Sequence, residues 1–397
     1  MRKSVYELAM SLITDTAALA AFCGRAAAFP YITVDTEFIR EKTYWPELCL
    51  VQVGTPDEAV AIDSLAEGMD LGPLFELLAN EAVLKVFHAA RQDVEIFVYL
   101  SRKVPHPIFD TQVAAMVCGY GDSVGYERLV RDIARQSIDK TMRFTDWSKR
   151  PLGKKQLEYA LGDVTHLRKI YDRLSRQLDS SGRASWLSEE MAVLTDPGTY
   201  LIDPENAWKR LKTRSRKPKY LAMVRGLAAW REQTAQSNNV PRNRVLRDEA
   251  LTEIAAHAPK SADELLSLRS VSRERIGRDR AADIIQVLDE VRGLKPSDYP
   301  EPPKEGADTT DNGPSVELLK VLLKLRCDTH KVAQKLIASS SDIEEIAADD
   351  NADVPALHGW RREVFGEDAL RLKRGEIALT AEGSKIKVID IPRNTAG

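Results

Sequence analysis

The hydrophobic pattern of the first two hundred residues alternates between short apolar runs and amphipathic segments. Runs rich in Val, Ile and aromatic residues predict strands, whereas apolar positions three or four apart predict helices. Turns containing Gly or Pro separate the first three expected strands, a spacing typical of an antiparallel meander. Later strands alternate with helices, so the pattern predicts a mixed sheet flanked by helices. The expected strands are 32–38, 48–53, 59–63, 84–88 and 108–111, and the expected helices are 16–29, 71–78, 92–100 and 112–118.

Helical periodicity dominates the rest of the chain, where strand signals nearly vanish after about Glu205. Residues 294–315 contain five prolines, several acids and almost no apolar residues, which predicts a linker. The helices before and after it form two clusters of similar size and order, each with a capping-box pattern, at Ser261 and Ser341. We interpret them as two copies of one small helical module. The expected helices are 221–236, 247–256, 261–268 and 278–291, then 316–327, 330–336, 341–348, 359–365 and 366–374.

Length and composition agree with this division into domains. A chain of 397 residues exceeds one compact domain, and 43% hydrophobic with 29% charged residues is typical of a globular protein. No uncharged apolar run approaches the ~18 residues that a membrane span needs, and we expect a cytoplasmic protein with no membrane partner. The predicted fold is an α/β domain with a mixed sheet, followed by two all-α helical-bundle domains. The predicted boundaries are 1–204, 205–294 for the first helical domain, 295–314 for the linker and 315–392 for the second.

Charge is distributed unevenly along a chain of net charge −3. Residues 1–200 carry 23 Lys and Arg against 28 Asp and Glu, whereas residues 201–250 carry 12 against 5. Such a basic stretch indicates an anionic polymer as partner, and the alternative is a solvated helical face. The candidate binding residues are Lys212, Arg214, Arg216, Lys217 and Lys219.

Asp35 and Glu37 lie on the first expected strand, Ile32–Phe38. Alternate residues of a strand point to the same face, so the two carboxylates project side by side. Carboxylates held this close repel each other, and burying them unpaired is costly. A divalent cation between them would remove that cost. The alternative is that both are solvated side chains at a strand end.

Two further segments add candidate residues. Asp93 lies between an expected strand and the helix that follows it, a position at which α/β proteins often carry their functional residues. Tyr159 and Asp163 are four residues apart on a long expected helix, so they share one face. Apolar residues surround Asp163 along that helix, which is unusual for a merely solvated Asp. Read alone, Asp93 could instead be a helix cap.

Together these segments resemble the three exonuclease motifs of the superfamily named for its four acidic residues. The stretch Trp147–Leu152, which leads into the helix of Tyr159, resembles the ribonuclease D family of bacterial 3′-to-5′ exoribonucleases. The two helical modules resemble the paired helicase-and-ribonuclease-D C-terminal (HRDC) domains of that family. The resemblance covers nearly the whole chain and implies a ribonuclease H-like fold for the α/β domain. Glu158 stands where a sister branch has histidine, which places the chain in the tyrosine branch.

The resemblance implies a two-metal hydrolysis of RNA 3′ ends that releases 5′-mononucleotides. Asp35, Glu37 and Asp163 would hold one Mg²⁺ or Mn²⁺ ion, Asp35 and Asp93 a second, and Tyr159 would orient the attacking water. The family further implies transfer-RNA precursors with 3′ extensions as substrates, and we expect a monomer. Two alternatives remain: a DNA 3′-to-5′ exonuclease of the same superfamily, or a catalytically decayed RNA-binding protein.

Four other polar residues near these motifs are not expected to be ligands. We interpret Asp63 as a turn residue and Asp110 as a helix cap, because both follow expected strands. His88 and His166 match no ligand position of the family. We therefore expect them to be packing or hydrogen-bonding residues.

Overall fold

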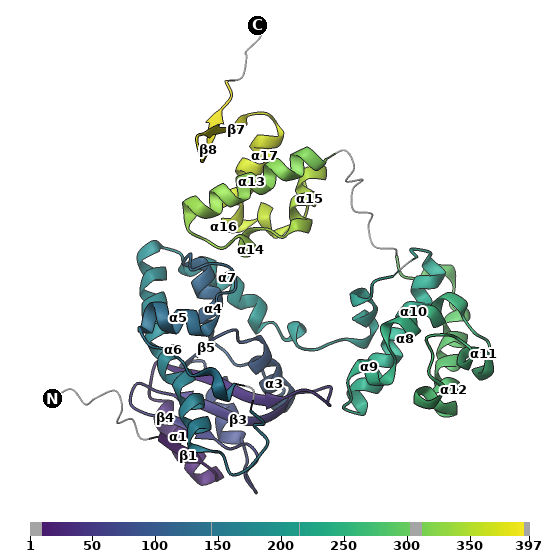
Figure 1. Ribbon diagram of the computed structural model, residues 1–397, viewed down its shortest axis with the longest axis horizontal. Helices are drawn as coiled ribbons and strands as arrows, with labels where there is room; N and C mark the ends of the chain where they lie inside the picture. Colours follow the sequence, from purple (N-terminus) through teal and green to yellow (C-terminus); the bar gives the residue numbers. More distant parts are fainter. Residues whose placement is uncertain (1–9, 144, 214, 302–311, 393–397) are drawn as a thin grey trace, which may run out of the picture.

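The computed structural model describes residues 10–143, 145–213, 215–301 and 312–392. Its N-terminal part is a mixed six-stranded sheet flanked by helices, and two helical clusters follow (Figure 1). The strands are β1 Met10–Ile13, β2 Tyr31–Ile39, β3 Glu47–Gly54, β4 Ala59–Ile62, β5 Leu84–Phe87 and β6 Ile108–Asp110. The helices of this part are α1 Thr16–Ala26, α2 Gly72–Ala79, α3 Arg91–Ser101, α4 Thr111–Val117, α5 Tyr126–Leu129, α6 Lys154–Ser181 and α7 Ala184–Thr195.

The sheet has the strand order β1-β4-β3-β2-β5-β6. Strands β2, β3 and β4 form the predicted antiparallel meander, and β5 and β6 add to β2 in parallel. Strand β1, which pairs in parallel with β4, was not predicted. It is only four residues long and follows no turn signal, so its hydrophobic pattern is too short to separate it from the helix behind it.

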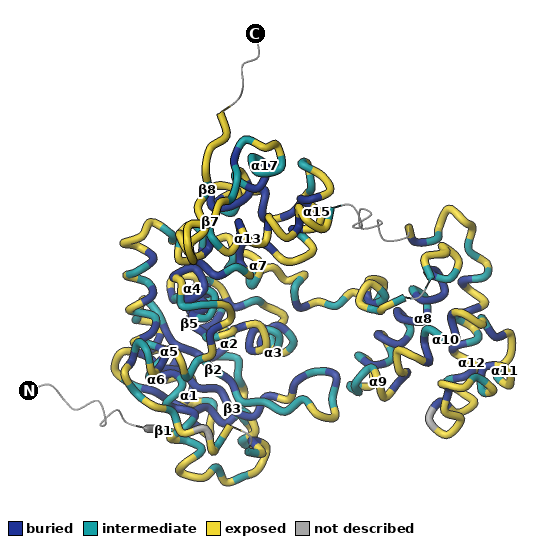
Figure 2. Tube along the Cα trace, turned by 45° about the horizontal axis from the view of Figure 1, so that its top comes forward, coloured by how far each residue is buried: buried dark blue, intermediate teal, exposed yellow. Residues whose placement is uncertain are grey.

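Helix α6 crosses the face of the sheet that carries the alternate residues Thr33, Asp35 and Glu37 of β2. The hydroxyl of Thr33 donates a hydrogen bond to the carbonyl oxygen of Val164, at 2.8 Å. Apolar residues of α6 and of β3 and β4 pack together on this face, and the other face forms the main core with α1 and α2. Figure 2 shows this buried core running along the sheet. A helix anchored in this way brings its own residues over the end of β2.

The two helical clusters follow the expected order of elements. The first consists of α8 Pro218–Ser237, α9 Arg242–Val245, α10 Asp248–His257, α11 Ala262–Leu266 and α12 Arg273–Arg292. The second consists of α13 Gly313–His330, α14 Gln334–Ile337, α15 Ser340–Ala348, α16 Gly359–Arg361 and α17 Glu367–Lys373. In both clusters a long helix is followed by a four-residue helix and then by one of nine or ten residues. This shared order supports the proposal that the clusters are two copies of one module. The predicted domain boundaries stay a prediction, and α13 begins at Gly313, within the predicted linker.

Two details of the second cluster differ from the sequence prediction. A two-stranded antiparallel hairpin, β7 Ile377–Glu382 and β8 Lys385–Asp390, closes a domain that was expected to be all-α. The sequence carries a signal for this hairpin, because apolar residues alternate along both strands and the two residues between them, Gly383 and Ser384, are typical of a hairpin turn; the prediction overlooked it. The capping serine of α15 is Ser339, with Asp342 completing the box, rather than Ser341. Ser261 caps α11 as predicted.

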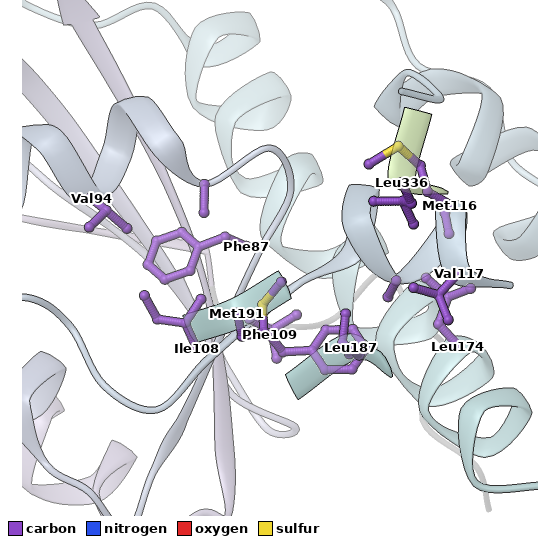
Figure 3. Close-up of a cluster of buried hydrophobic side chains, with 14 of the residues drawn as sticks. Phe87, Val94, Ile108, Phe109, Met116, Val117, Leu174, Leu187, Met191 and Leu336 are labelled. Atoms are coloured by element: carbon purple, nitrogen blue, oxygen red, sulfur yellow. The ribbon is translucent and has the colours of Figure 1, made fainter. Parts of the chain in front are cut away.

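The second cluster packs directly on the α/β domain and shares its hydrophobic core. Figure 3 shows Leu336 of α14 beside Met116 of α4 within this core. The indole rings of Trp186 on α7 and Trp360 on α16 stack at 4.3 Å between centroids. The Arg183 guanidinium donates to the carbonyl oxygen of Lys331 at 3.1 Å. These contacts join the two parts into one packed unit.

The first helical cluster meets the α/β domain through the loop that joins β2 to β3. The hydroxyl of Tyr44 donates to the buried carboxylate of Glu232 on α8, and Arg242 donates to the same carboxylate at 2.6 Å. The side-chain oxygen of Asn239 accepts from the backbone N–H groups of Tyr44 and Trp45, at 3.1 and 3.0 Å. Glu232 is the single acid between Lys209 and Arg247, and it therefore serves the domain contact. No helix among the described residues is long and apolar enough to cross a membrane.

Candidate active site

Three carboxylates meet beneath α6 at the end of β2. Asp35 and Glu37 are alternate residues of β2 and point to the same face, and Asp163 reaches them from α6. One carboxylate oxygen of each residue lies within 4.8 Å of the others. Strand alternation and helix periodicity therefore bring together three residues that are up to 128 positions apart in the sequence.

Asp93 lies beside this group of three but is not part of it. It stands in the first turn of α3, directly beyond the end of β5, and is buried. The hydroxyl of Thr36 donates to its carboxylate. Since Thr36 lies between Asp35 and Glu37 on β2, this bond ties Asp93 to the strand that carries the other two acids.

Burial raises the pKa of all four acids, and the charges of neighbouring acids raise it further for Glu37, Asp93 and Asp163. Desolvation raises the pKa of Asp35 to about 7. Desolvation, followed by the charges of Asp35, Asp163 and Asp93, raises the pKa of Glu37 to about 10. The pKa values of Asp93 and Asp163 also rise well above the ordinary value, again mainly through burial and next through the charge of Asp35. Without a cation, the cluster therefore holds protons that exposed carboxyl groups would release.

Two tyrosines bond to Asp163. The Tyr159 hydroxyl donates to its side chain, and the Tyr126 hydroxyl donates to its backbone carbonyl oxygen. Burial, and then the charge of Asp163, raises the pKa of each tyrosine above its ordinary value. Both therefore remain protonated donors. Tyr126 was not singled out from the sequence, because its partner lies 37 residues further along and no local pattern connects them.

The carboxylates line a cleft of about 1210 Å³ that also contains cationic and amide side chains. Lys42, Arg128 and Arg143 contribute positive charge to its walls, none of which was predicted to do so. His88 also lines the cleft, and its Nδ1 lies 3.0 Å from the hydroxyl oxygen of Thr111, as expected of a hydrogen-bonding residue. A cleft with acids at its base and cations along its walls can accept a phosphodiester together with a metal ion.

The donor set fits a hard divalent cation. Mg²⁺ and Mn²⁺ prefer carboxylate oxygens, and the cluster offers three of them within reach of one point and a fourth nearby. The repulsion that raises the pKa values would be relieved by positive charge between the carboxylates. Asp35, Glu37 and Asp163 are thus the residues that could hold such an ion.

The structure gives Asp63 and Asp110 structural roles. Asp110 caps α4 by accepting from the backbone N–H of Gln112 at 2.7 Å, as predicted. Asp63 accepts from the backbone N–H of Leu65 at 3.0 Å, which is the predicted turn. It also forms a buried ion pair with Arg150 at 2.6 Å. This pair was missed because the two residues are 87 positions apart.

The predicted basic residues lie outside the cleft. Lys212, Arg216, Lys217 and Lys219 are exposed around the start of α8, and Arg214 lies outside the described residues. None of these four described residues lines the cleft. Other basic residues of the same stretch form internal ion pairs, since Arg231 bonds to Asp248 at 2.6 Å. The number of basic residues in this stretch of sequence is therefore larger than the number of positive charges that a partner could contact.

The raised pKa values predict that the metal-free protein loses stability as pH rises. The folded cluster retains protons that the unfolded chain releases near pH 4, so stability falls from about pH 4 up to about pH 7 for Asp35 and up to about pH 10 for Glu37. Each retained proton contributes about 1.4 kcal/mol per pH unit. We expect the Tm in EDTA to fall from pH 5 to pH 8, and Mg²⁺ to flatten the profile. The Tm of the Asp35→Asn variant should fall less steeply with pH. A Tm slope equal to that of the wild type would contradict the raised pKa of Asp35.

Comparison with known proteins places this site in a family. The family model described as 3′-5′ exonuclease matches residues 10–179, and the HRDC domain model matches residues 221–288. Ribonuclease D of Nitrobacter hamburgensis is 55% identical over 95% of this chain and 98% of its own length. Ribonuclease D of Jannaschia sp. is 52% identical over 96% of this chain and 99% of its own.

A solved structure agrees over the same extent. The crystal structure of Escherichia coli RNase D, described as an exoribonuclease involved in structured RNA processing, superposes with a TM-score of 0.80. It is 30% identical and covers 92% of this chain and 98% of its own. The match includes the mixed-sheet domain and the helical region together. The chain therefore belongs to the ribonuclease D family of 3′-5′ exoribonucleases.

Proposed function

We propose that the cleft beneath α6 hydrolyses RNA from its 3′ end with two divalent cations, Mg²⁺ or Mn²⁺. Asp35, Glu37 and Asp163 would hold one cation, and Asp35 and Asp93 would hold the second. The observation that carries the proposal is the meeting of three carboxylates within 4.8 Å at the base of a cleft with basic walls. A cation would stabilise such a set, because it would relieve the repulsion among the acids.

The side chains have distinct parts in the proposed reaction. When bound, the cations would stabilise the charge on the attacking and leaving oxygens of the phosphodiester. The Tyr159 hydroxyl donates its one proton to Asp163, and its oxygen can accept a hydrogen bond from the attacking water and so orient it. Arg128 and Arg143 face the same cleft and can bind phosphate oxygens of the RNA. Tyr126 fixes the backbone of α6 at Asp163.

The proposed substrates are RNA 3′ ends, and the proposed products are 5′-mononucleotides. Membership of the ribonuclease D family supports RNA as the partner. Transfer-RNA precursors with 3′ extensions are the substrates that we propose within this class. A monomeric state and a cytoplasmic location stay predictions.

The test uses one RNA and a DNA of the same sequence, both labelled at the 3′ end. With Mg²⁺ or Mn²⁺ we expect labelled 5′-mononucleotide to be released from the RNA, and EDTA should abolish release. Preferential release from DNA would favour the DNA exonuclease instead. Binding of RNA without release from either polymer would favour the decayed, RNA-binding alternative. Internal fragments rather than mononucleotides would contradict exonucleolytic cleavage.

The basic residues around the start of α8 predict salt-dependent binding of RNA. Phosphate contacts release condensed counterions, and log affinity for single strands falls with log salt by ~0.7 per contact. Changing Lys212, Arg214, Arg216, Lys217 and Lys219 to glutamine should make the slope shallower by up to about three units. Filter binding at several salt concentrations measures the slope of log affinity against log salt. Cleavage of a saturating short oligonucleotide should change little, because none of the four that are described lines the cleft.

A matched control removes the same charge from the second helical cluster. The exposed lysines Lys320, Lys324, Lys331, Lys385 and Lys387 can be changed to glutamine together. We expect the salt slope of this variant to equal that of the wild type. Equal slopes in both five-residue variants and the wild type would mean that the basic residues around the start of α8 only solvate the surface.

A further inference from the structure

Gln52 of β3 is a fully buried amide whose hydrogen-bonding groups are unused. Its exposed fraction is 0%, and neither Nε2 nor Oε1 has a hydrogen-bond partner among the described residues. An unsatisfied buried polar group lowers folding stability by about 1–3 kcal/mol, and an apolar side chain of the same size avoids this desolvation cost. A buried amide in the middle of a sheet therefore requires an explanation.

The register of the sheet places Gln52 next to the carboxylate cluster. Gln52 pairs directly with Asp35 of β2 on one side and with Ala61 of β4 on the other. Residues directly opposite in an antiparallel pair point to the same face, with Cβ atoms about 4.5–5.5 Å apart. The Gln52 side chain thus shares the face of Asp35, and Ala61 gives it no polar contact.

Helix α6 covers this face without satisfying the amide. Its residues over β3 and β4 are apolar, with Leu161 and Val164 packed against Leu50 and Ala61. Two carbonyl oxygens of α6 accept hydrogen bonds from side-chain hydroxyls, that of Val164 from Thr33 and that of Asp163 from Tyr126, but the helix gives Gln52 no partner. The Asp35 carboxylate accepts one bond from the backbone N–H of Thr36. A carboxylate has lone pairs for about four donors, so Asp35 retains capacity toward Gln52.

We propose that Gln52 is a positioning residue of the active site: its otherwise unused side-chain N–H donates to the Asp35 carboxylate when that carboxylate binds a divalent cation, and this bond fixes the orientation of the ligand. Ligating carboxylates are commonly held by such outer hydrogen bonds, and loss of the outer partner costs about 10–100-fold in metal affinity. Gln52 acts through Asp35 and touches neither cation nor RNA. The inference rests on the proposed function, because it requires Asp35 to be a metal ligand.

The test replaces Gln52 by methionine, which has a similar length and no N–H donor. Titrating metal-free protein with Mn²⁺ in a calorimeter should show a Kd raised by about 10–100-fold. The Tm in EDTA should stay equal or rise, because an unsatisfied buried amide has been removed. Weaker Mn²⁺ binding with unchanged or higher stability is the signature of a positioning residue. A merely structural amide, including one bonded to buried water, would leave the Kd unchanged and overturn the proposal.

Gln136→Met is the matched control. Oε1 of Gln136 is also buried without a partner among the described residues, but Gln136 does not line the cleft. Its substitution should leave the Mn²⁺ Kd unchanged; an equal loss in both variants would overturn the proposal. If Gln52→Met does not melt cooperatively, Gln52→Asn replaces it. That variant keeps the amide but withdraws it from Asp35 by one methylene, and it should also weaken Mn²⁺ binding.

Asp35→Asn in the same titration separates two kinds of failure. If Asp35→Asn binds Mn²⁺ like the wild type, the proposed metal site is wrong. If Asp35→Asn weakens binding and Gln52→Met does not, the metal site stands and the role of Gln52 is wrong. If both weaken it, both proposals are supported.

Discussion

Replacing Asp35 or Asp163 by asparagine is expected to lower the rate of RNA hydrolysis by about 10³-fold or more. Each substitution removes a charged oxygen ligand from the group of three, and the stabilisation that a bound cation gives the transition state is several kcal/mol. At 1.36 kcal/mol for each factor of ten, this corresponds to at least three orders of magnitude. Single-turnover release of 3′-terminal nucleotide at saturating Mn²⁺ measures the loss.

The same substitutions should not weaken the fold. In the absence of metal each removes a source of repulsion, since the charge of Asp35 raises the pKa of Glu37, Asp93 and Asp163. We therefore expect the Tm in EDTA at pH 8 to equal or exceed that of the wild type. Asp179→Asn, an exposed acid on the same helix, is the control and should change neither rate nor Tm. Wild-type turnover in either active-site variant would refute the ligand assignment.

Local periodicity explains why the carboxylate group could be predicted from the sequence. Two-residue alternation places Asp35 beside Glu37, and four-residue spacing places Tyr159 on the face of Asp163. These relations hold within a single strand or helix, whatever the fold around them. The ribonuclease D resemblance then joined the segments, and the structure brings three of the four acids within 4.8 Å.

Contacts between distant segments could not be predicted in the same way. The pairing of Asp63 with Arg150, the bond from Tyr126 to Asp163 and the position of Gln52 opposite Asp35 all depend on sheet register and on the path of α6. A one-residue shift in register would turn Gln52 to the other face. No pattern within the Gln52 segment itself indicates that its amide lies beside a candidate ligand.

The basic stretch shows why charge composition is a weak guide to a binding surface. Glu232 is its single acid, and the structure buries that acid against Tyr44 and Arg242 where the first helical cluster meets the α/β domain. Sequence counting treats Arg242 as one more free cation. Breaking a buried ion pair by removing one partner costs about 3–5 kcal/mol, so these residues stabilise the domain contact. Only the exposed members of the stretch remain candidates for RNA.

Tyr159→Phe is expected to lower turnover by about 10²-fold. Mn²⁺ affinity should stay close to that of the wild type, because Tyr126 still holds the backbone of α6 at Asp163. The Tyr159 hydroxyl donates to Asp163, and its pKa lies above the ordinary value through burial and neighbouring carboxylates. It therefore acts as a donor that orients groups in the cleft, and not as a base. Misplacing a reacting group by about 1 Å can cost 10²-fold.

The remaining ring should keep the local packing of Tyr159. It lies 6.2 Å from the ring of Trp147, between centroids, and phenylalanine retains that contact. Tyr171→Phe is the matched control, because Tyr171 lies further along α6 with its ring against Tyr31 and Phe109 and away from the cleft. Its turnover should equal that of the wild type. A Tyr159→Phe enzyme that binds Mn²⁺ weakly but turns over normally when saturated would make Tyr159 a structural support of Asp163, because the hydroxyl would then hold a ligand without orienting water.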